Sequence, residues 1–190
     1  MKFIRTDIPD VIVIEPKVFG DERGYFVETF RQDKLDDFLG FKVDFIQDNE
    51  SKSGYGVLRG LHYQLAPASQ TKLVRVIKGK VLDVAVDIRK GSPTFGKHVA
   101  VELSEQNKLQ MFVPRGFAHG FVVLEDDTIF AYKVDNYYSP ENDRGLAFDD
   151  ASLAIDWTVD KEQLQLSQKD TRQPTLDQAE FFDYRTDLYA

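Results

Sequence analysis

Short runs of residues that alternate between apolar and polar side chains dominate the sequence from Ile12 to Tyr138. In the run 80–88, Leu82, Val84 and Val86 fall on one face, and Asp83 and Asp87 fall on the other. A repeat of two residues is that of a β-strand, whereas a helix repeats every 3.6 residues. The alternation therefore predicts a fold built from many short strands.

Turn-forming segments such as 52–54, 78–79, 91–93 and 125–127 separate these runs. The predicted strands are 25–30, 45–49, 57–64, 73–77, 80–88, 98–103, 110–113, 117–124 and 128–137. Helical periodicity is limited to 32–39 and 160–166. This order predicts an all-β barrel or sandwich with a few short helices. No repeat or linker divides the chain, so we expect one domain over residues 1–190, with a polar C-terminal arm from about residue 171.

The composition excludes several classes of protein. The 24 basic and 32 acidic residues give a net charge of −8, which argues against a general nucleic-acid binder. The absence of cysteine excludes disulfides and thiolate chemistry. No stretch approaches the ~20 apolar residues of a membrane span, and the first residues do not look like a signal peptide. We expect a cytoplasmic protein without a membrane partner.

Two of the three histidines, His62 and His119, lie in glycine-containing segments that resemble the paired motifs of cupins, which are small double-sheet jelly-roll barrels. The second motif is intact, with Pro114, Gly116 and His119. The first keeps His62, but Gln64 stands at the second histidine position and Lys72 at the glutamate position. The resemblance implies a cupin-like barrel in which two of the usual four metal ligands are replaced.

These replacements change the expected chemistry. A lysine ammonium has no lone pair to offer a metal and repels the ion, so we expect neither a metal nor another cofactor. Alternation would place Lys72 inside the barrel with His62, and a fixed cation there can stabilise an oxyanion. The competing interpretation is that His62 and Lys72 are packing residues, but an unpaired buried ammonium is expensive.

Other polar residues suggest a phosphorylated ligand. The guanidinium groups of Arg23 and Arg59 match phosphate oxygens, and the Gln47 and Asn49 amides could read a base edge. Tyr132 could donate a proton or stack against a ring. No P-loop and no GxGxxG motif is present.

Taken together, these segments resemble the dTDP-4-dehydrorhamnose 3,5-epimerase family. The matching stretches are 21–30, 47–49, 56–64, 72–75, 83–96, 114–121, 132–133 and 166–170, in the family's order along nearly the whole chain. The resemblance implies an isomerase that inverts C3 and C5 of dTDP-4-dehydro-6-deoxy-D-glucose, in the biosynthesis of dTDP-L-rhamnose. It also implies a homodimer whose subunits exchange N-terminal strands.

The resemblance assigns roles residue by residue. His62 matches the proton acceptor, Asp170 its carboxylate partner, Tyr132 the proton donor, and Lys72 the residue that steadies the enolate. The residues that match contacts to the nucleotide, diphosphate or sugar are Phe19, Arg23, Glu28, Gln47, Asn49, Arg59, His119, Tyr138, Asp143 and Lys169.

Alternation places Arg59 on the strand face opposite His62, although the resemblance has both touching the ligand. A bulge at Gly60 would reconcile the two. The alternatives left open are an epimerase that inverts only one carbon of another nucleotide 4-keto-sugar, a metal-dependent cupin enzyme, and a non-catalytic sugar-binding barrel.

Overall fold

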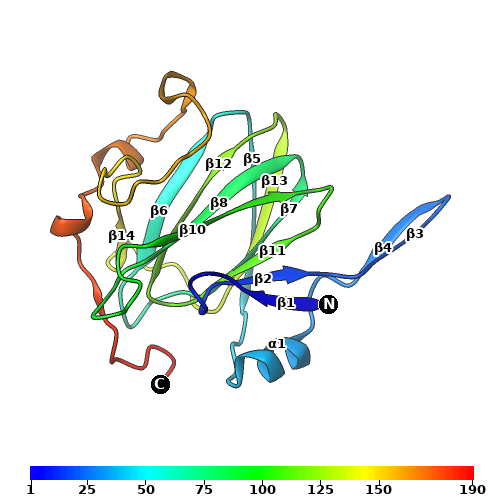
Figure 1. Cartoon of the computed structure of the whole chain (residues 1–190), viewed down its shortest axis with the longest axis horizontal. Helices are drawn as coiled ribbons and strands as arrows, with labels where there is room; N and C mark the ends of the chain where they lie inside the picture. Colours follow the sequence, from blue (N-terminus) through cyan, green and yellow to red (C-terminus); the bar gives the residue numbers. More distant parts are fainter.

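The computed structural model describes residues 1–190, and two antiparallel sheets dominate it (Figure 1). The six-stranded sheet has the order β1 (Lys2–Arg5), β2 (Ile12–Glu15), β11 (Gln110–Val113), β7 (Lys72–Lys78), β13 (Thr128–Val134) and β5 (Gln47–Ser53). The five-stranded sheet has the order β10 (His98–Ser104), β8 (Lys80–Asp87), β12 (Phe117–Val123), β6 (Leu58–Gln64) and β14 (Asp143–Gly145).

The smaller elements lie around these sheets. A hairpin joins β3 (Val18–Asp21) to β4 (Gly24–Val27), and β9 (Arg89–Lys90) pairs in parallel with β15 (Phe182–Asp183). The helical elements are α1 (Gln32–Leu39) and the single 3-10 turns η1 (Lys161–Gln163), η2 (Asp170–Arg172) and η3 (Leu176–Gln178). None of the helices is long and apolar enough to cross a membrane.

Apolar side chains from the facing sides of the two sheets form the central core. Val74, Val76 and Phe130 come from the six-stranded sheet, while Ala85 and Phe121 come from the five-stranded one. The rings of Phe121 and Phe130 stack across the interior with their centroids 4.0 Å apart. Burying these side chains is the main favourable term for closing the two sheets on each other.

Each sheet also buries part of its outer face. Residues 146–188 run along the outside of the five-stranded sheet (orange and red in Figure 1), where Trp157 and Phe182 pack on Val84 and Val86. Helix α1 covers the other sheet through Leu35. It ends at Leu39, and the left-handed backbone of the next residue, Gly40 (φ 79°), closes the last turn.

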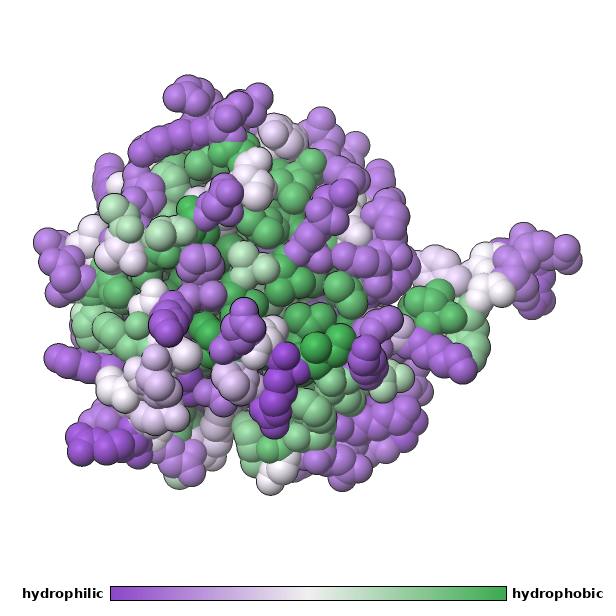
Figure 2. Space-filling view, viewed as in Figure 1, coloured by the Kyte–Doolittle hydropathy of each residue, from purple (hydrophilic) through white to green (hydrophobic).

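The β3–β4 hairpin projects away from the body of the protein (Figures 1 and 2). Its large apolar side chains Val18, Phe19, Tyr25 and Phe26 are all exposed. One contact joins the hairpin to the body through Tyr25: its hydroxyl accepts a hydrogen bond from Lys108 Nζ at 2.9 Å. A patch of this kind is typical of an interaction surface.

The predicted all-β, double-sheet class is confirmed, and the bounds of α1 and β11 agree with the sequence prediction. The strand predicted at 45–49 exists as β5, but its bounds were wrong, because Lys52 and Ser53 belong to the strand rather than to a turn. They pair there with Ile129 and Thr128 of β13, and this ladder outweighs the local turn preference of a Lys-Ser-Gly segment. The strands β1, β2, β3, β9, β14 and β15 were not predicted.

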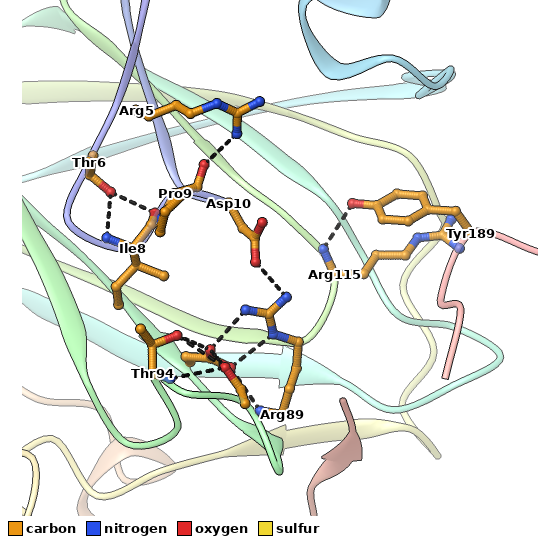
Figure 3. A network of polar contacts seen from close by, with 11 residues as sticks. Arg5, Thr6, Ile8, Pro9, Asp10, Arg89, Thr94, Arg115 and Tyr189 are labelled. Carbon is orange, nitrogen blue, oxygen red and sulfur yellow. Dashed lines mark hydrogen bonds and ion pairs between the residues drawn. The ribbon is translucent and has the colours of Figure 1, made fainter. Parts of the chain in front are cut away.

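An ion-pair network centred on the buried Asp87 joins the turn between β1 and β2 to the end of β8 (Figure 3). The Asp87 carboxylate is fully buried and accepts hydrogen bonds from Arg89, Ser92 and Thr94. Arg89 also pairs with Asp10 at 2.8 Å. Burial by itself would raise the pKa of Asp87, but these hydrogen bonds outweigh burial and hold that pKa below its ordinary value.

The C-terminal arm is anchored beside this network. The Arg115 guanidinium donates to the Leu188 carbonyl at 2.7 Å, and its backbone N–H donates to the Tyr189 hydroxyl at 3.1 Å. The Tyr189 hydroxyl also shares a 2.8 Å hydrogen bond with Thr71, the residue before Lys72. The arm therefore packs against the barrel near the start of β7.

We predict that Arg89→Met destabilises the fold by about 3–5 kcal/mol, because it leaves the buried Asp87 carboxylate without its cation. Urea unfolding measures the change. Arg185→Met is the matched control, since Arg185 pairs with Asp183 at the same spacing but its side chain is 88% exposed, against 13% for Arg89. We expect a change of about 0–1 kcal/mol there. Equal losses in both variants would contradict the role given to the buried pair.

Candidate active site

A β-bulge in strand β6 turns Arg59 and His62 into the same cavity. His62 is opposite His119 in β12 and Arg59 is opposite Phe121, so β6 contains one more residue than β12 between these pairs. Gly60 has a φ of 141°, and a Cβ built on it would lie 2.4 Å from the Cα of Gly120. Only glycine fits this close approach, and the bulge resolves the conflict between strict alternation and a shared site.

This cavity of about 280 Å³ lies between the two sheets at the bulge. His62 and His119 enter it from the five-stranded sheet, whereas Lys72 and Tyr132 enter it from the six-stranded sheet. The other polar groups that line it are Glu50, Ser51, Arg59, Ser167 and Asp170. His62 and Tyr132 therefore stand on opposite walls, with Phe121 and Phe130 contributing the apolar part.

His62 forms a tight pair with Asp170. Its Nε2 lies 2.5 Å from Asp170 Oδ1, and the Ser167 hydroxyl donates to Asp170 Oδ2 at 2.6 Å. Burial would raise the pKa of Asp170, but the hydrogen bonds from His62 and Ser167 outweigh it and lower that pKa. An ionised carboxylate only accepts hydrogen bonds, so the ring proton resides on Nε2 and the lone pair on Nδ1 is free.

Lys72, Asp83 and His119 make up the charged interior of the barrel. Both Asp83 oxygens contact His119 Nε2, at 2.9 and 3.0 Å, and Lys72 Nζ donates to the His62 carbonyl at 3.4 Å. Burial lowers the pKa of Lys72 to about 8, with Asp83 and Asp143 opposing the shift. Burial likewise lowers the pKa of His119 and raises that of Asp83. The lysine thus keeps its proton at neutral pH while being a stronger acid than usual.

Tyr132 lies on β13, where it pairs with Val74 and with Asn49. Burial raises the pKa of its phenol. The group therefore remains protonated at neutral pH and can donate a hydrogen bond or a proton into the cavity.

A second cavity of about 320 Å³ adjoins the first and shares His62, Lys72 and Tyr132 with it. The other predicted ligand contacts that line it are Gln47, Asn49, Tyr138, Asp143 and Lys169. Asp143 accepts a hydrogen bond from the Tyr138 hydroxyl at 2.9 Å and pairs with Lys169. Amide, phenol and ammonium groups converge on this cavity, which suits a polar ligand.

Three predicted contacts lie outside both cavities. Phe19 and Arg23 are on the projecting hairpin, where the Arg23 side chain is 85% exposed and pairs only with Asp21. Glu28 follows the hairpin and pairs with Arg31 and Lys34. A single chain does not bring these residues to His62.

Asp83 and Ser167 belong to the site but were missed in the sequence. Alternation had placed Asp83 on the face opposite Leu82 and Val84, and that face proves to be the barrel interior. A carboxylate in the middle of an otherwise apolar stretch of strand was the available signal. For Ser167 the signal was its spacing of three residues from Asp170, typical of a hydroxyl that caps a turn.

No group of three or more histidine, aspartate or glutamate side chains is arranged as metal ligands would be. His62 and His119 are each bonded to a carboxylate, and Lys72 stands near both.

Comparison with known proteins identifies the family. The sequence model described as dTDP-4-dehydrorhamnose 3,5-epimerase matches residues 5–178. The chain belongs to the dTDP-4-dehydrorhamnose 3,5-epimerase family. The relative of that name from Shigella flexneri is 54% identical over 182 residues, which is 96% of this chain and 99% of that protein. The predicted family is therefore confirmed.

Solved structures agree with this family. The dTDP-6-deoxy-D-glucose-3,5-epimerase of Legionella pneumophila Philadelphia 1, in complex with dTDP-4-keto-L-rhamnose, has a TM-score of 0.93 and 48% identity, covering 97% of this chain and 99% of that one. A 3'-monoepimerase of Streptomyces bikiniensis in complex with dTDP-quinovose is less similar, with a TM-score of 0.86 and 32% identity over 90% and 86% of the two chains.

We predict that Gly60→Ala destabilises the protein by about 2–4 kcal/mol, because its Cβ would collide with the Gly120 backbone. Urea titration measures the loss in the free energy of unfolding. Gly40→Ala is the control: Gly40 is also left-handed, but nothing lies within 4 Å of its added Cβ. It should lose only the ~1–2 kcal/mol of the left-handed backbone. A Gly60 variant as stable as the Gly40 variant would argue against the close approach.

Proposed function

We propose that the protein converts dTDP-4-dehydro-6-deoxy-D-glucose to dTDP-4-dehydro-L-rhamnose by moving protons at C3 and C5. The observation that carries this proposal is that the His62–Asp170 pair and Tyr132 stand on opposite walls of one cavity, with Lys72 beside them. Inversion of a carbon requires proton removal from one face and proton return to the other. Membership of the epimerase family and relatives that bind dTDP-sugars support the same substrate.

His62 acts as the base. The C4 ketone acidifies the C3 and C5 hydrogens, because the electron pair left on carbon delocalises onto the ketone oxygen. Asp170 orients the ring through Nε2, so Nδ1 accepts the proton, and the carboxylate then stabilises the imidazolium. Ser167 supports the carboxylate from its other oxygen.

Lys72 stabilises the enolate oxygen. Its ammonium is preformed in a largely buried site, where it interacts with developing negative charge more strongly than it would in water. Its lowered pKa, about 8, also makes it a better hydrogen-bond donor than an ordinary lysine. The negative charge moves from carbon to oxygen during the step, so this interaction is strongest after the proton has left.

Tyr132 returns a proton to the opposite face of the carbon. The enolate collapses to the ketone as the phenol O–H bond breaks and the new C–H bond forms. The tyrosinate then regains its proton from solvent, and His62 releases its own. The step involves no net oxidation or reduction, because substrate and product are isomers. The same set of groups acts at C5 after the ring turns.

The second cavity holds the nucleotide half of the substrate. Arg59 and Lys169 provide donors for the diphosphate and sugar and His119 contacts them from the same wall, while Gln47, Asn49, Tyr138 and Asp143 contact the nucleotide. All of these groups line the cavities next to His62, which supports one continuous ligand site.

A homodimer completes the site. The projecting hairpin carries Phe19 and Arg23 with exposed apolar neighbours and has few contacts with its own chain. We infer that it crosses to a second copy, where Phe19 stacks on the nucleotide and Arg23 and Glu28 contact the ligand. This arrangement explains why three predicted contacts lie far from His62 in a single chain.

With the 4-keto substrate in D2O, we predict deuterium at both C3 and C5 of the product, and an L-rhamno configuration by NMR. Exchange with solvent follows from proton return by groups that equilibrate with water. Deuterium at only one carbon would instead identify a single-position epimerase, and none at either would contradict the proposed chemistry.

His62→Ala and Tyr132→Phe should fail in different ways. Without the base, exchange and product formation should both fall by about 10²–10⁴-fold. Without the acid, product formation should fall while abstraction and return on the base side continue, so some deuterium still enters unchanged substrate. Equal loss of all exchange in both variants would argue against separate base and acid roles.

The exchanged hairpin predicts complementation between two defective variants. His62→Ala and Arg23→Ala chains with different tags are co-expressed, and the mixed dimer is isolated. One of its two sites combines an intact His62 with an intact Arg23 from the other chain, so about half the wild-type activity should return at low substrate concentration. A mixed dimer as inactive as its parents would show that each site uses its own hairpin.

A further inference from the structure

Gln64, which stands where a cupin metal ligand would be, uses its side-chain amide on the backbone of two loops. Its side chain is buried, at 4% exposure, at the end of β6. The Nε2 group donates to the Ala68 carbonyl at 2.7 Å and to the Tyr137 carbonyl at 3.1 Å. The Oε1 atom accepts the Ser139 N–H at 2.7 Å. Both N–H donors of the amide are therefore engaged by protein backbone.

Two of these three hydrogen bonds involve the backbone groups of the residues next to Tyr138. Tyr137 and Ser139 are its chain neighbours, so the amide fixes the backbone immediately before and after it. The Tyr138 side chain is 61% exposed, and its hydroxyl donates to Asp143 Oδ2 at 2.9 Å. With so little packing of its own, the ring depends on the backbone for its position over the second cavity.

The link also reaches the opposite loop. Ala68 lies between β6 and β7, in the loop that leads to Lys72, and Tyr137 lies between β13 and β14. One buried amide thus ties together the two loops that border the second cavity. An aliphatic side chain or an ionised carboxylate of the same size has no N–H to donate, so it would leave the Ala68 and Tyr137 carbonyls without this hydrogen-bond partner.

We propose that Gln64 is a positioning residue that holds Tyr138 in place for the nucleotide half of the substrate. This inference rests on the proposed function, because it assumes that the second cavity binds the nucleotide. Gln64 acts on binding through Tyr138 and takes no part in proton transfer. Its removal should therefore weaken dTDP binding and raise KM while leaving kcat within about twofold, since His62, Lys72 and Tyr132 keep their supports.

Gln64→Glu tests this with a pH-dependent signature. At pH 8 an ionised carboxylate would face the Ala68 and Tyr137 carbonyls, and dTDP should bind about tenfold more weakly by calorimetry, or about 1.4 kcal/mol. On acidification to pH 5.5 the protonated carboxyl can donate to one carbonyl, so the variant-to-wild-type ratio of Kd should shrink. Gln64→Met, which cannot donate at any pH, should show the loss without recovery.

Gln165→Glu is the matched control. Its amide also donates to a backbone carbonyl, that of Tyr55 at 2.9 Å, but it lies away from both cavities. Its Kd for dTDP should equal that of the wild type across the pH range. Equal weakening by both glutamates would overturn the proposal. Because Gln64 itself lines the second cavity, the uncharged Gln64→Met variant excludes a direct effect of negative charge, and wild-type binding of dTDP by that variant would also overturn the proposal.

A double-mutant cycle separates action through Tyr138 from a general structural role. In a Tyr138→Ala background, Gln64→Glu should weaken dTDP binding by less than about twofold, because its target is already gone. A full tenfold loss in that background, or a fall in kcat with unchanged Kd, would overturn the proposal.

Amide hydrogen exchange provides a readout that needs no ligand. In Gln64→Met the Ser139 N–H loses its acceptor, so residues 136–140 should exchange about tenfold faster than in the wild type while strand β12 stays protected. Unchanged exchange in that segment would overturn the positioning role. A wild-type protein that fails to bind dTDP would contradict the proposed function, and the exchange result would still decide whether Gln64 fixes the Tyr138 segment.

Discussion

Burial of a lysine ammonium between the two sheets is the constraint on which the site depends. An isolated charge in such a place is strongly unfavourable, so the surrounding residues must compensate for it. The Asp83 carboxylate opposes the fall in the pKa of Lys72, and His119 and Lys72 in turn partly oppose the rise that burial causes in the pKa of Asp83. No buried side-chain polar atom is left without a hydrogen-bond partner. Asp83 therefore stabilises the charge of Lys72, whereas burial and the charge of Lys72 both favour a neutral His119.

The backbone meets this constraint through one irregular strand. Regular alternation would allow only every second residue of β6 to face the interior. The bulge at Gly60 adds a residue, so Arg59 and His62 both reach the cavity, while Gly120 on the neighbouring strand provides the room. Such irregularities weaken a sheet locally. Here Phe121, which is opposite Arg59 at the edge of the bulge, stacks on Phe130 and supplies packing next to the interrupted ladder.

Much of the strand pattern could be predicted from the sequence, because alternation is a local signal. Alternation found β11 with its bounds, and helical periodicity, also a local signal, found α1. Alternation could not say which face of β8 is the interior. Both faces are buried, one by the opposite sheet and one by the C-terminal segment, so Asp83 was not recognised as a site residue. The partnership of His62 and Asp170, 108 residues apart, has no local signature and came only from the family resemblance. Likewise, no local pattern in the sequence links Phe19, Arg23 and Glu28 to the site, and in a single chain they lie outside both cavities.

Backbone pairing fixes the relative position of His62 and Asp170. Residues Gly56 and Leu58, at the start of the strand that carries His62, exchange backbone hydrogen bonds of 2.8 and 3.0 Å with Gln165. The chain then has only five residues in which to reach Asp170, and Ser167 fixes the turn within them. His62 and Asp170 are therefore positioned by the same short set of hydrogen bonds, because the segment that carries Asp170 is paired with the start of the strand that carries His62. Because the rest of the C-terminal segment is held in place by packing on the five-stranded sheet, the same apolar contacts that stabilise the fold also set the geometry of the base.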